Sequence, residues 1–249
     1  MFTDTHCHFE KQYYDNFDEV IQRAIDNNVN RFIACGCSKE SNIESLDLSD
    51  KYDFIYSTIG YHPDQADIVT DEDIDLLEEQ IKSNKVIGIG EIGLDYHYEG
   101  YSKEKQFSLF KKQLELAEKY NLPVVIHSRD AVQDTIDILK QYKVKGVIHS
   151  FSLSKEVADI YINMGFKLGI NGVVTFKNCN LINTLKEIGI NEIVFETDAP
   201  YMTPHPHRGE KNESKYIYDI ANFVSNECNI SVEELSKITN KNINEIFDI

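Results

Sequence analysis

The sequence is poor in several residue types, and each shortage excludes a class of protein. Its 249 residues include no tryptophan, five prolines and five cysteines. With 41% hydrophobic and 27% charged residues, the composition excludes wholesale disorder, collagen and a small disulfide scaffold. No apolar run approaches the ~18–20 residues that a membrane-spanning helix needs. Cys35 and Cys37 are one residue apart, not two as in a redox or zinc pair, and we interpret them as small packing residues.

Basic residues are also scarce. The chain has 25 Lys and Arg against 42 Asp and Glu, for a net charge of −17. This balance excludes a broad basic face that binds a long nucleic-acid duplex by counterion release. It still permits chemistry on a phosphate or acyl group inside one pocket. Residues 1–6 lack the basic and apolar regions of a signal peptide, and the cysteine count is odd. We therefore predict reduced thiols and a cytoplasmic protein, with no membrane association and no obligate protein partner.

Short β-branched runs alternate with longer amphipathic stretches along the whole chain. This alternation predicts βαβ units with a parallel sheet. Eight units in this length predict one domain, residues 1–249, folded as a (β/α)8 TIM barrel with extra C-terminal helices. A doubly wound sheet would be expected to have a glycine-rich turn after its first strand, where this sequence has His6-Cys7-His8. The predicted strands are Phe2–Thr5, Arg31–Ala34, Phe54–Ile59, Val86–Gly90, Val124–Ile126, Gly146–Ile148, Phe166–Leu168 and Ile193–Phe195. The clearest predicted helices are Ser102–Tyr120, Ser214–Cys228 and Ser231–Phe247.

Potential metal ligands follow five of the predicted strands. In a barrel of this type the carboxyl ends of the strands carry the chemistry. Side chains two residues apart on a strand point the same way, so His6 and His8 can face one ion. Burying this many polar groups together is costly unless they are paired or coordinated. The predicted ligands are His6, His8, Glu91, His127, His149 and Asp198.

The number of ligands predicts two metal ions. A single catalytic Zn²⁺ usually takes three protein ligands, whereas six suit a pair of ions with a shared carboxylate. We assign His6, His8 and Asp198 to one ion, His127 and His149 to the other, and a bridging role to Glu91. Asp198 is then placed to orient the attacking water and accept its proton, so Asp198 and Glu91 are the predicted catalytic residues. These ligand types accept Zn²⁺, Mn²⁺ or Mg²⁺.

The order of motifs resembles one known family. The sequence is similar to the TatD-type metal-dependent hydrolases of the amidohydrolase superfamily along nearly the whole chain. The matching blocks are Phe2–His8, Gly60–Pro63, Gly90–Tyr96, Pro123–Ala131, His149–Phe151, Gly172–Asn178, Glu196–Pro200 and Arg208–Glu213. One departure is Ser214, which stands where the family commonly has proline after Asn-Glu.

The resemblance implies a (β/α)8 barrel with two divalent ions on the same six ligands. Family members are usually described as deoxyribonucleases, often acting from the 3′ end, and some relatives remove D-amino acids from tRNA. We therefore expect a DNase that acts on single-stranded or frayed 3′ ends. Residues expected to contact the substrate are His62, Tyr96, Arg129, Lys177 and Arg208.

Four alternatives remain beside the nuclease. Ester hydrolysis on D-aminoacyl-tRNA would need the same ligands. A trinuclear phosphoesterase also begins with His-x-His and would bind about three metals. An amidohydrolase bridged by a carboxylated lysine is disfavoured, because the fourth predicted strand ends in Glu91 while Lys85 lies at its other end. A non-catalytic binding barrel would be expected to have an incomplete ligand set.

Overall fold

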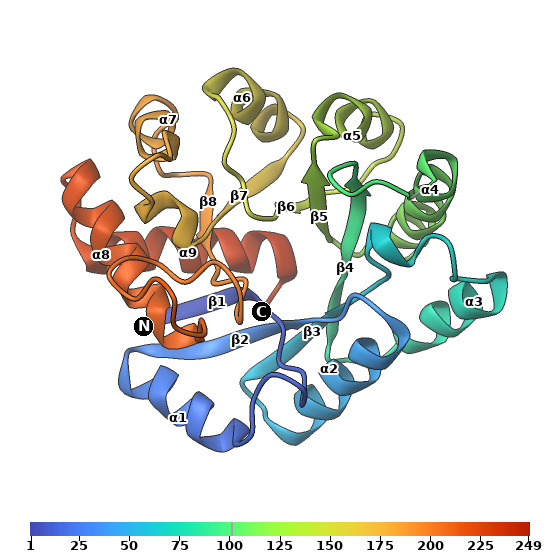
Figure 1. The fold of residues 1–249 in the computed structure, drawn as a ribbon, viewed down its shortest axis with the longest axis horizontal. Helices are drawn as coiled ribbons and strands as arrows, with labels where there is room; N and C mark the ends of the chain where they lie inside the picture. Colours follow the sequence, from blue (N-terminus) through green and yellow to red (C-terminus); the bar gives the residue numbers. More distant parts are fainter. Residues whose placement is uncertain (101) are drawn as a thin grey trace.

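The computed structural model describes residues 1–100 and 102–249. Eight parallel strands form one sheet in chain order, each hydrogen-bonded to the next along the chain (Figure 1). The strands are β1 Phe2–Cys7, β2 Val29–Cys35, β3 Ile55–Ile59, β4 Val86–Asp95, β5 Val124–Arg129, β6 Gly146–Ile148, β7 Phe166–Ile170 and β8 Ile193–Phe195. The bounds predicted for β6 and β8 are confirmed.

The sheet nearly closes into a barrel where β1 meets the segment after β8. The Asp198 N–H donates to the His6 carbonyl at 2.9 Å, and the His8 N–H donates to the Ala199 carbonyl at 2.8 Å. Cys7 and Ala199 form a parallel bridge. The predicted (β/α)8 barrel is confirmed, and its seam passes through three of the predicted metal ligands.

Helices alternate with the strands and surround the sheet (Figure 1). They are α1 Phe17–Asp26, α2 Lys39–Lys51, α3 Asp71–Gln80, α4 Lys103–Tyr120, α5 Val132–Leu139, α6 Lys155–Asn163, α7 Leu181–Ile188, α8 Ile217–Cys228 and α9 Val232–Phe247. Short 3₁₀ helices cover Pro63–Gln65, Gly172–Thr175 and Ser214–Tyr216. None of the helices in the described ranges has the length and hydrophobicity needed to cross a membrane.

Helix α9 covers the end of the barrel where the strands begin. The Asn242 side chain donates to the carbonyls of Asn191 and Ile193, at the start of β8. The Asn240 side chain donates to the Met1 carbonyl, just before β1. Apolar side chains from the barrel interior and from α9 form one cluster there. Its buried members are Ile33, Ile87, Val125, Val147, Val194, Ile243, Ile246 and Phe247. Chemistry is therefore left to the opposite end of the barrel.

The same strands that build this apolar floor carry the polar site above it. Residues two apart on a strand share a side of the sheet. Val125 of β5 is followed on its own side by His127, and Val147 of β6 by His149. The inward-facing row of each strand thus changes from apolar to polar toward its carboxyl end.

Three strands that bear predicted ligands extend past their predicted ends, because the residues there still pair with a neighbouring strand. β4 was expected to stop at Gly90, but Gly93 pairs with His127, and Asp95 pairs with Arg129 of β5. β1 continues to Cys7. Glu91 and His127 therefore lie within strands, where ladder hydrogen bonds hold their backbones.

Candidate metal centre

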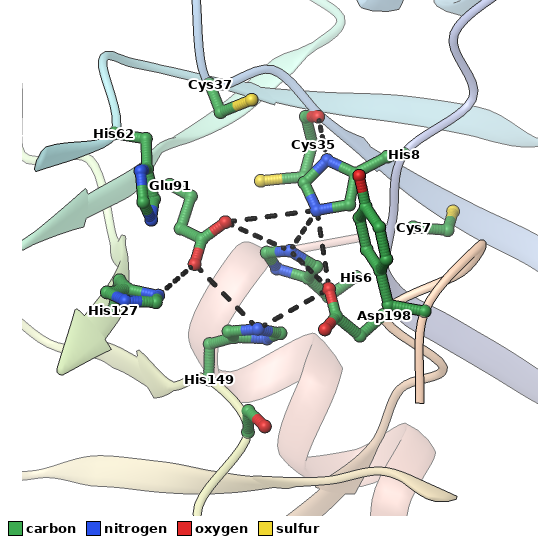
Figure 2. A network of polar contacts seen from close by, with 12 residues as sticks. His6, Cys7, His8, Cys35, Cys37, His62, Glu91, His127, His149 and Asp198 are labelled. Carbon is green, nitrogen blue, oxygen red and sulfur yellow. Dashed lines mark hydrogen bonds and ion pairs between the residues drawn. The ribbon is translucent and has the colours of Figure 1, made fainter. Parts of the chain in front are cut away.

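Six side chains from β1, β4, β5, β6 and the segment after β8 converge at the carboxyl end of the barrel (Figure 2). They are the six predicted ligands, His6, His8, Glu91, His127, His149 and Asp198. Imidazole and carboxylate groups face one another across short distances. The rings of His6 and His149 stack with centroids 3.7 Å apart. The sequence-based expectation that these residues share one site agrees with their positions.

Four donor atoms have the spacing expected of ligands to one ion. His6 Nε2 lies 3.2 Å from His8 Nε2, 3.5 Å from Glu91 Oε2 and 3.8 Å from Asp198 Oδ1. His8 Nε2 lies 3.9 Å from Glu91 Oε2 and 3.4 Å from Asp198 Oδ1. Zinc–nitrogen bonds of 2.0–2.1 Å in a tetrahedron place the donor atoms about 3.4 Å apart. The donor set therefore fits a divalent ion without rearrangement.

The two carboxylate oxygens of Glu91 face two different pairs of histidines. Oε2 faces His6 and His8 at the distances above. Oε1 lies 2.7 Å from His127 Nδ1 and 3.8 Å from His149 Nε2. This is the arrangement required of a carboxylate that bridges two ions. His127, His149 and Glu91 are thus the residues able to hold a second ion.

The electrostatics of the cluster favour bound positive charge. Burial alone would raise the pKa of Glu91, but His149, His127 and His6 lower it well below its usual range. Burial also opposes ionisation of Asp198, yet His149 and His8 lower the pKa of that carboxyl. Both carboxylates are therefore ionised at neutral pH and need a cation beside them.

His149 is held from behind by a carboxylate that the sequence analysis did not assign. Glu196 is fully buried, and its Oε1 accepts the Ser150 N–H at 2.6 Å and lies 2.9 Å from His149 Nδ1. Burial would lower the pKa of His149, but Glu196, Glu91 and Asp198 raise it to about 10. Gly169 makes room for this carboxylate, since a Cβ there would lie 2.4 Å from Glu196 Oε2.

Replacing Glu196 with glutamine is expected to weaken metal binding at His149 by about 10- to 100-fold, the usual cost of losing a partner behind a ligand histidine. A competition titration with a chromogenic chelator measures this. Glu192→Gln is the matched control, because Glu192 pairs with Lys167 near the start of β8. Equal affinity in Glu196→Gln and wild type would show that Glu196 does not orient His149.

Asp95 has the corresponding position behind His127. Asp95 Oδ2 lies 3.1 Å from His127 Nε2. Burial would lower the pKa of His127, but Asp95 and Glu91 raise it to about 9. His62 packs edge-to-face on His127 with centroids 4.4 Å apart. Neither Asp95 nor Glu196 was predicted; each is two residues from a predicted ligand, and that spacing is the signal by which both could have been found.

A buried carboxylate below the site fixes the segment that carries Asp198. Asp4 accepts the Thr197 N–H at 2.9 Å and hydroxyl hydrogen bonds from Thr197 and Ser214, both at 2.6 Å. Complete burial raises the pKa of Asp4 to about 6, although these hydrogen bonds oppose the shift. Ser214, the departure from the family's proline, thus supplies a hydrogen bond that proline could not. This network helps to fix the Thr197 backbone next to Asp198.

Two thiols lie at the edge of the cluster. Cys35 Sγ comes within 4.8 Å of donor atoms of His6 and Glu91, and Cys37 Sγ comes equally near donors of His8 and Glu10. The interpretation of Cys35 and Cys37 as packing residues therefore understates their position. Cys35 is buried and accepts a hydrogen bond from Thr58, whereas Cys37 lines the pocket.

The metal cluster lies in a pocket of about 590 Å³, and the predicted substrate contacts divide into two groups around it. His62 and Arg129 line the pocket. Arg129 donates to the Tyr98 hydroxyl at 3.3 Å, which resolves whether it pairs with a nearby carboxylate.

The other three predicted contacts are not among the pocket-lining residues. The Tyr96 hydroxyl donates to Asp134 at 2.8 Å. The Arg208 guanidinium donates to the Thr203 carbonyl and stacks on Phe176. Lys177 is exposed outside the lining. Each contact holds a loop together or faces solvent, so these residues are removed from the set of candidate substrate ligands.

Comparisons with known proteins agree with this site. Residues 3–248 match the model of the TatD related DNase family. The chain belongs to this family. It is 39% identical to an uncharacterized metal-dependent hydrolase, YabD of Bacillus subtilis, over 100% of both chains. It is 31% identical to an uncharacterized metal-dependent hydrolase, YcfH of Escherichia coli K12, over 99% of this chain and 95% of that one.

A solved structure extends the likeness to three dimensions. The TatD homologue YjjV of Escherichia coli K12 has a TM-score of 0.93 at 27% identity, covering 100% of this chain and 98% of that one. The family and the relatives establish a metal-dependent hydrolase on a TIM barrel, as the sequence predicted.

Proposed function

We propose that this member of the TatD related DNase family hydrolyses phosphodiester bonds of DNA, releasing nucleotides from single-stranded or frayed 3′ ends. The observation that carries the proposal is the pair of Glu91 oxygens, each facing a separate pair of histidines. Two divalent ions, Zn²⁺, Mn²⁺ or Mg²⁺, held there would supply Lewis acidity to the phosphate and lower the pKa of the attacking water. We also propose a cytoplasmic location.

The protein's own residues divide the remaining work. Asp198 is the ionised carboxylate that both faces the histidines and lines the pocket, so it orients the water and accepts its proton. Glu91, with its side chain only 5% exposed, holds the two histidine pairs at a constant separation. Arg129 and His62 line the pocket, where they bind a non-bridging oxygen and the adjoining sugar-phosphate.

One structural observation favours the trinuclear phosphoesterase as a second candidate. Donor atoms of His62, Asp95 and His127 lie within 4.8 Å of one another. His62 Nδ1 already accepts the Asp64 N–H, however, so only its other ring nitrogen is available. Metal analysis of the purified protein distinguishes the two: about two ions per chain for the proposal, about three for this candidate.

The nuclease is tested against its closest rival by offering both substrates to one metal-loaded preparation. A 3′-labelled single-stranded oligonucleotide and a D-aminoacyl-tRNA need the same ligands but present a phosphate and a carbonyl. We expect stepwise loss of nucleotides from the 3′ end and little deacylation. Rapid deacylation with an intact oligonucleotide would assign the site to ester hydrolysis instead.

Chelation is expected to abolish hydrolysis while preserving the fold. The proposed ligands lie above the apolar floor of the barrel, so removing ions leaves that packing in place. Circular dichroism before and after EDTA, with an oligonucleotide assay and readdition of Mn²⁺, measures both effects. Undiminished turnover in fully chelated protein would remove metals from the mechanism.

Binding of single-stranded DNA is expected to depend weakly on salt. Two divalent ions with Glu91 and Asp198 leave a net charge of about +2 at the cluster, and Arg129 is the only Lys or Arg among the described residues that line the pocket. One or two neutralised phosphates predict less than about a tenfold loss of affinity between 50 and 200 mM salt. Anisotropy titrations with Ca²⁺ test this on single strands and on blunt duplex. A loss near 10³-fold, with duplex preferred, would reveal a basic track.

A further inference from the structure

The mouth of the metal pocket carries aromatic side chains that the hydrolytic roles leave unused. Nine large apolar side chains are exposed among the described residues, and Tyr98, Tyr201 and Met202 are the three that line this pocket. Tyr98 is 57% exposed and Tyr201 is 48% exposed. Clustering of exposed apolar groups at one cavity marks a surface that binds something.

Neighbours hold both rings in place without covering them. Tyr201 packs edge-to-face on Tyr13 with centroids 6.0 Å apart, and their hydroxyls lie 2.7 Å apart. The Arg129 guanidinium lies 5.3 Å from the Tyr98 ring and donates to its hydroxyl. Two chemical pairs result, Tyr13–Tyr201 and Tyr98–Arg129. Each presents a fixed, flat and partly exposed surface to the pocket.

The two pairs belong to opposite sides of the metal cluster. Tyr201 packs against the ring of His8, with centroids 6.2 Å apart. Arg129 follows His127 by two residues on β5. His8 and His127 lie on opposite sides of Glu91 (Figure 2). A phosphate bound at the cluster would therefore have one aromatic pair on each side.

The charge of the pocket explains why flat apolar surfaces would be needed. Its lining includes Glu10 and Asp64 besides the carboxylates of the cluster, and Arg129 is its single Lys or Arg in the described ranges. A cationic groove that follows the DNA backbone is absent from that lining. Base stacking supplies affinity without added positive charge, and every base has a face that can stack.

We propose that Tyr201 and Tyr98 each stack on one of the two bases that flank the scissile phosphate. The substrate is then a single strand whose last two bases have left the helical stack, which paired DNA provides only where its end frays. This inference rests on the proposed nuclease function and specifies how that site selects its substrate.

The test combines ring removal with base removal. Tyr98→Ala and Tyr201→Ala are assayed on a 3′-labelled ten-nucleotide strand and on copies with a tetrahydrofuran abasic unit at the last or penultimate position. Stacking of ~1–3 kcal/mol predicts that each alanine lowers kcat/KM about 5- to 150-fold on the intact strand. On the strand lacking the matching base, the same alanine should cost at most about twofold.

Controls separate stacking from damage to the fold. Phenylalanine at either position keeps a ring and should restore most of the lost rate. Tyr218→Ala removes a tyrosine that is 40% exposed outside the pocket lining and should match wild type. A 2-aminopurine at the stacked position should be quenched on binding to Ca²⁺-loaded wild type and not to the alanine variant.

Two different failures are distinguishable. Alanine variants that lose the same factor on intact and abasic strands, or lose nothing on either, overturn the stacking proposal while leaving the nuclease intact. Wild-type protein with two bound metals that cleaves no oligonucleotide rejects the nuclease itself, and the stacking proposal with it.

Discussion

Replacing Glu91 with alanine is expected to lower hydrolysis by more than about 100-fold and to reduce bound metal from two ions toward one. Losing only a partner behind a metal ligand usually costs 10- to 100-fold, and Glu91 contacts both pairs of histidines directly. His6, His8 and Asp198 still provide three donors for one ion, whereas His127 and His149 provide only two. Inductively coupled plasma mass spectrometry, paired with rate measurements, gives both quantities.

The matched control is Glu192→Ala, which removes a glutamate from the ion pair with Lys167 near the start of β8. It should keep two ions and the wild-type rate. Two retained ions with a near-normal rate in Glu91→Ala would refute the bridging role. Circular dichroism is needed for both variants, because Glu91 lies within a buried strand.

The barrel could be predicted because its signals are local and repeated. Short β-branched runs such as Gly146–Ile148 and Ile193–Phe195 are strands with those bounds in the structure. Ser102 and Ser231, predicted as first helical residues, are instead the N-caps whose side chains accept from the backbone of α4 and α9. Such errors of one residue follow from the preference of serine for caps.

The six predicted ligands could be brought together for the same reason. In a closed parallel barrel the carboxyl ends of all strands meet, so a residue's place along its own strand sets its place in the site. His127 and His149 illustrate this, since each lies two residues beyond an inward-facing valine. No long-range information was needed beyond the fold class.

The residues around the ligands could not be predicted in this way, because their positions depend on loops. Tyr96 directly follows β4, yet its hydroxyl reaches Asp134, 38 residues along the chain. Arg208 folds back onto Phe176 from a separate segment. Tyr98 and Tyr201 were not selected, since an isolated tyrosine in a loop has no periodic pattern that indicates where its ring points. Loop side chains take their direction from tertiary contacts.

Asp198→Asn is expected to separate metal binding from proton transfer. Asparagine keeps a side-chain oxygen toward His6, His8 and His149, which lie 3.8, 3.4 and 3.6 Å from Asp198 Oδ1. It cannot accept a proton from the attacking water, and loss of a general base costs about 10²- to 10⁴-fold. The variant should therefore retain at least one ion, and most of its metal, while losing nearly all turnover.

The pH–rate profile decides whether this loss reflects the proton. In wild type, burial opposes ionisation of Asp198 but the surrounding histidines lower the pKa of its carboxyl, so the base form should disappear only as the pH falls below the usual carboxylate range. The acid limb of kcat should flatten in Asp198→Asn if that group is the base. Asp134→Asn is the control, because Asp134 is a carboxylate that accepts from Tyr96 outside the pocket lining, and it should keep both the limb and the rate. An unchanged limb together with loss of one metal would make Asp198 a ligand only, and the proton would then have to leave through Glu91, whose two oxygens already face the two histidine pairs.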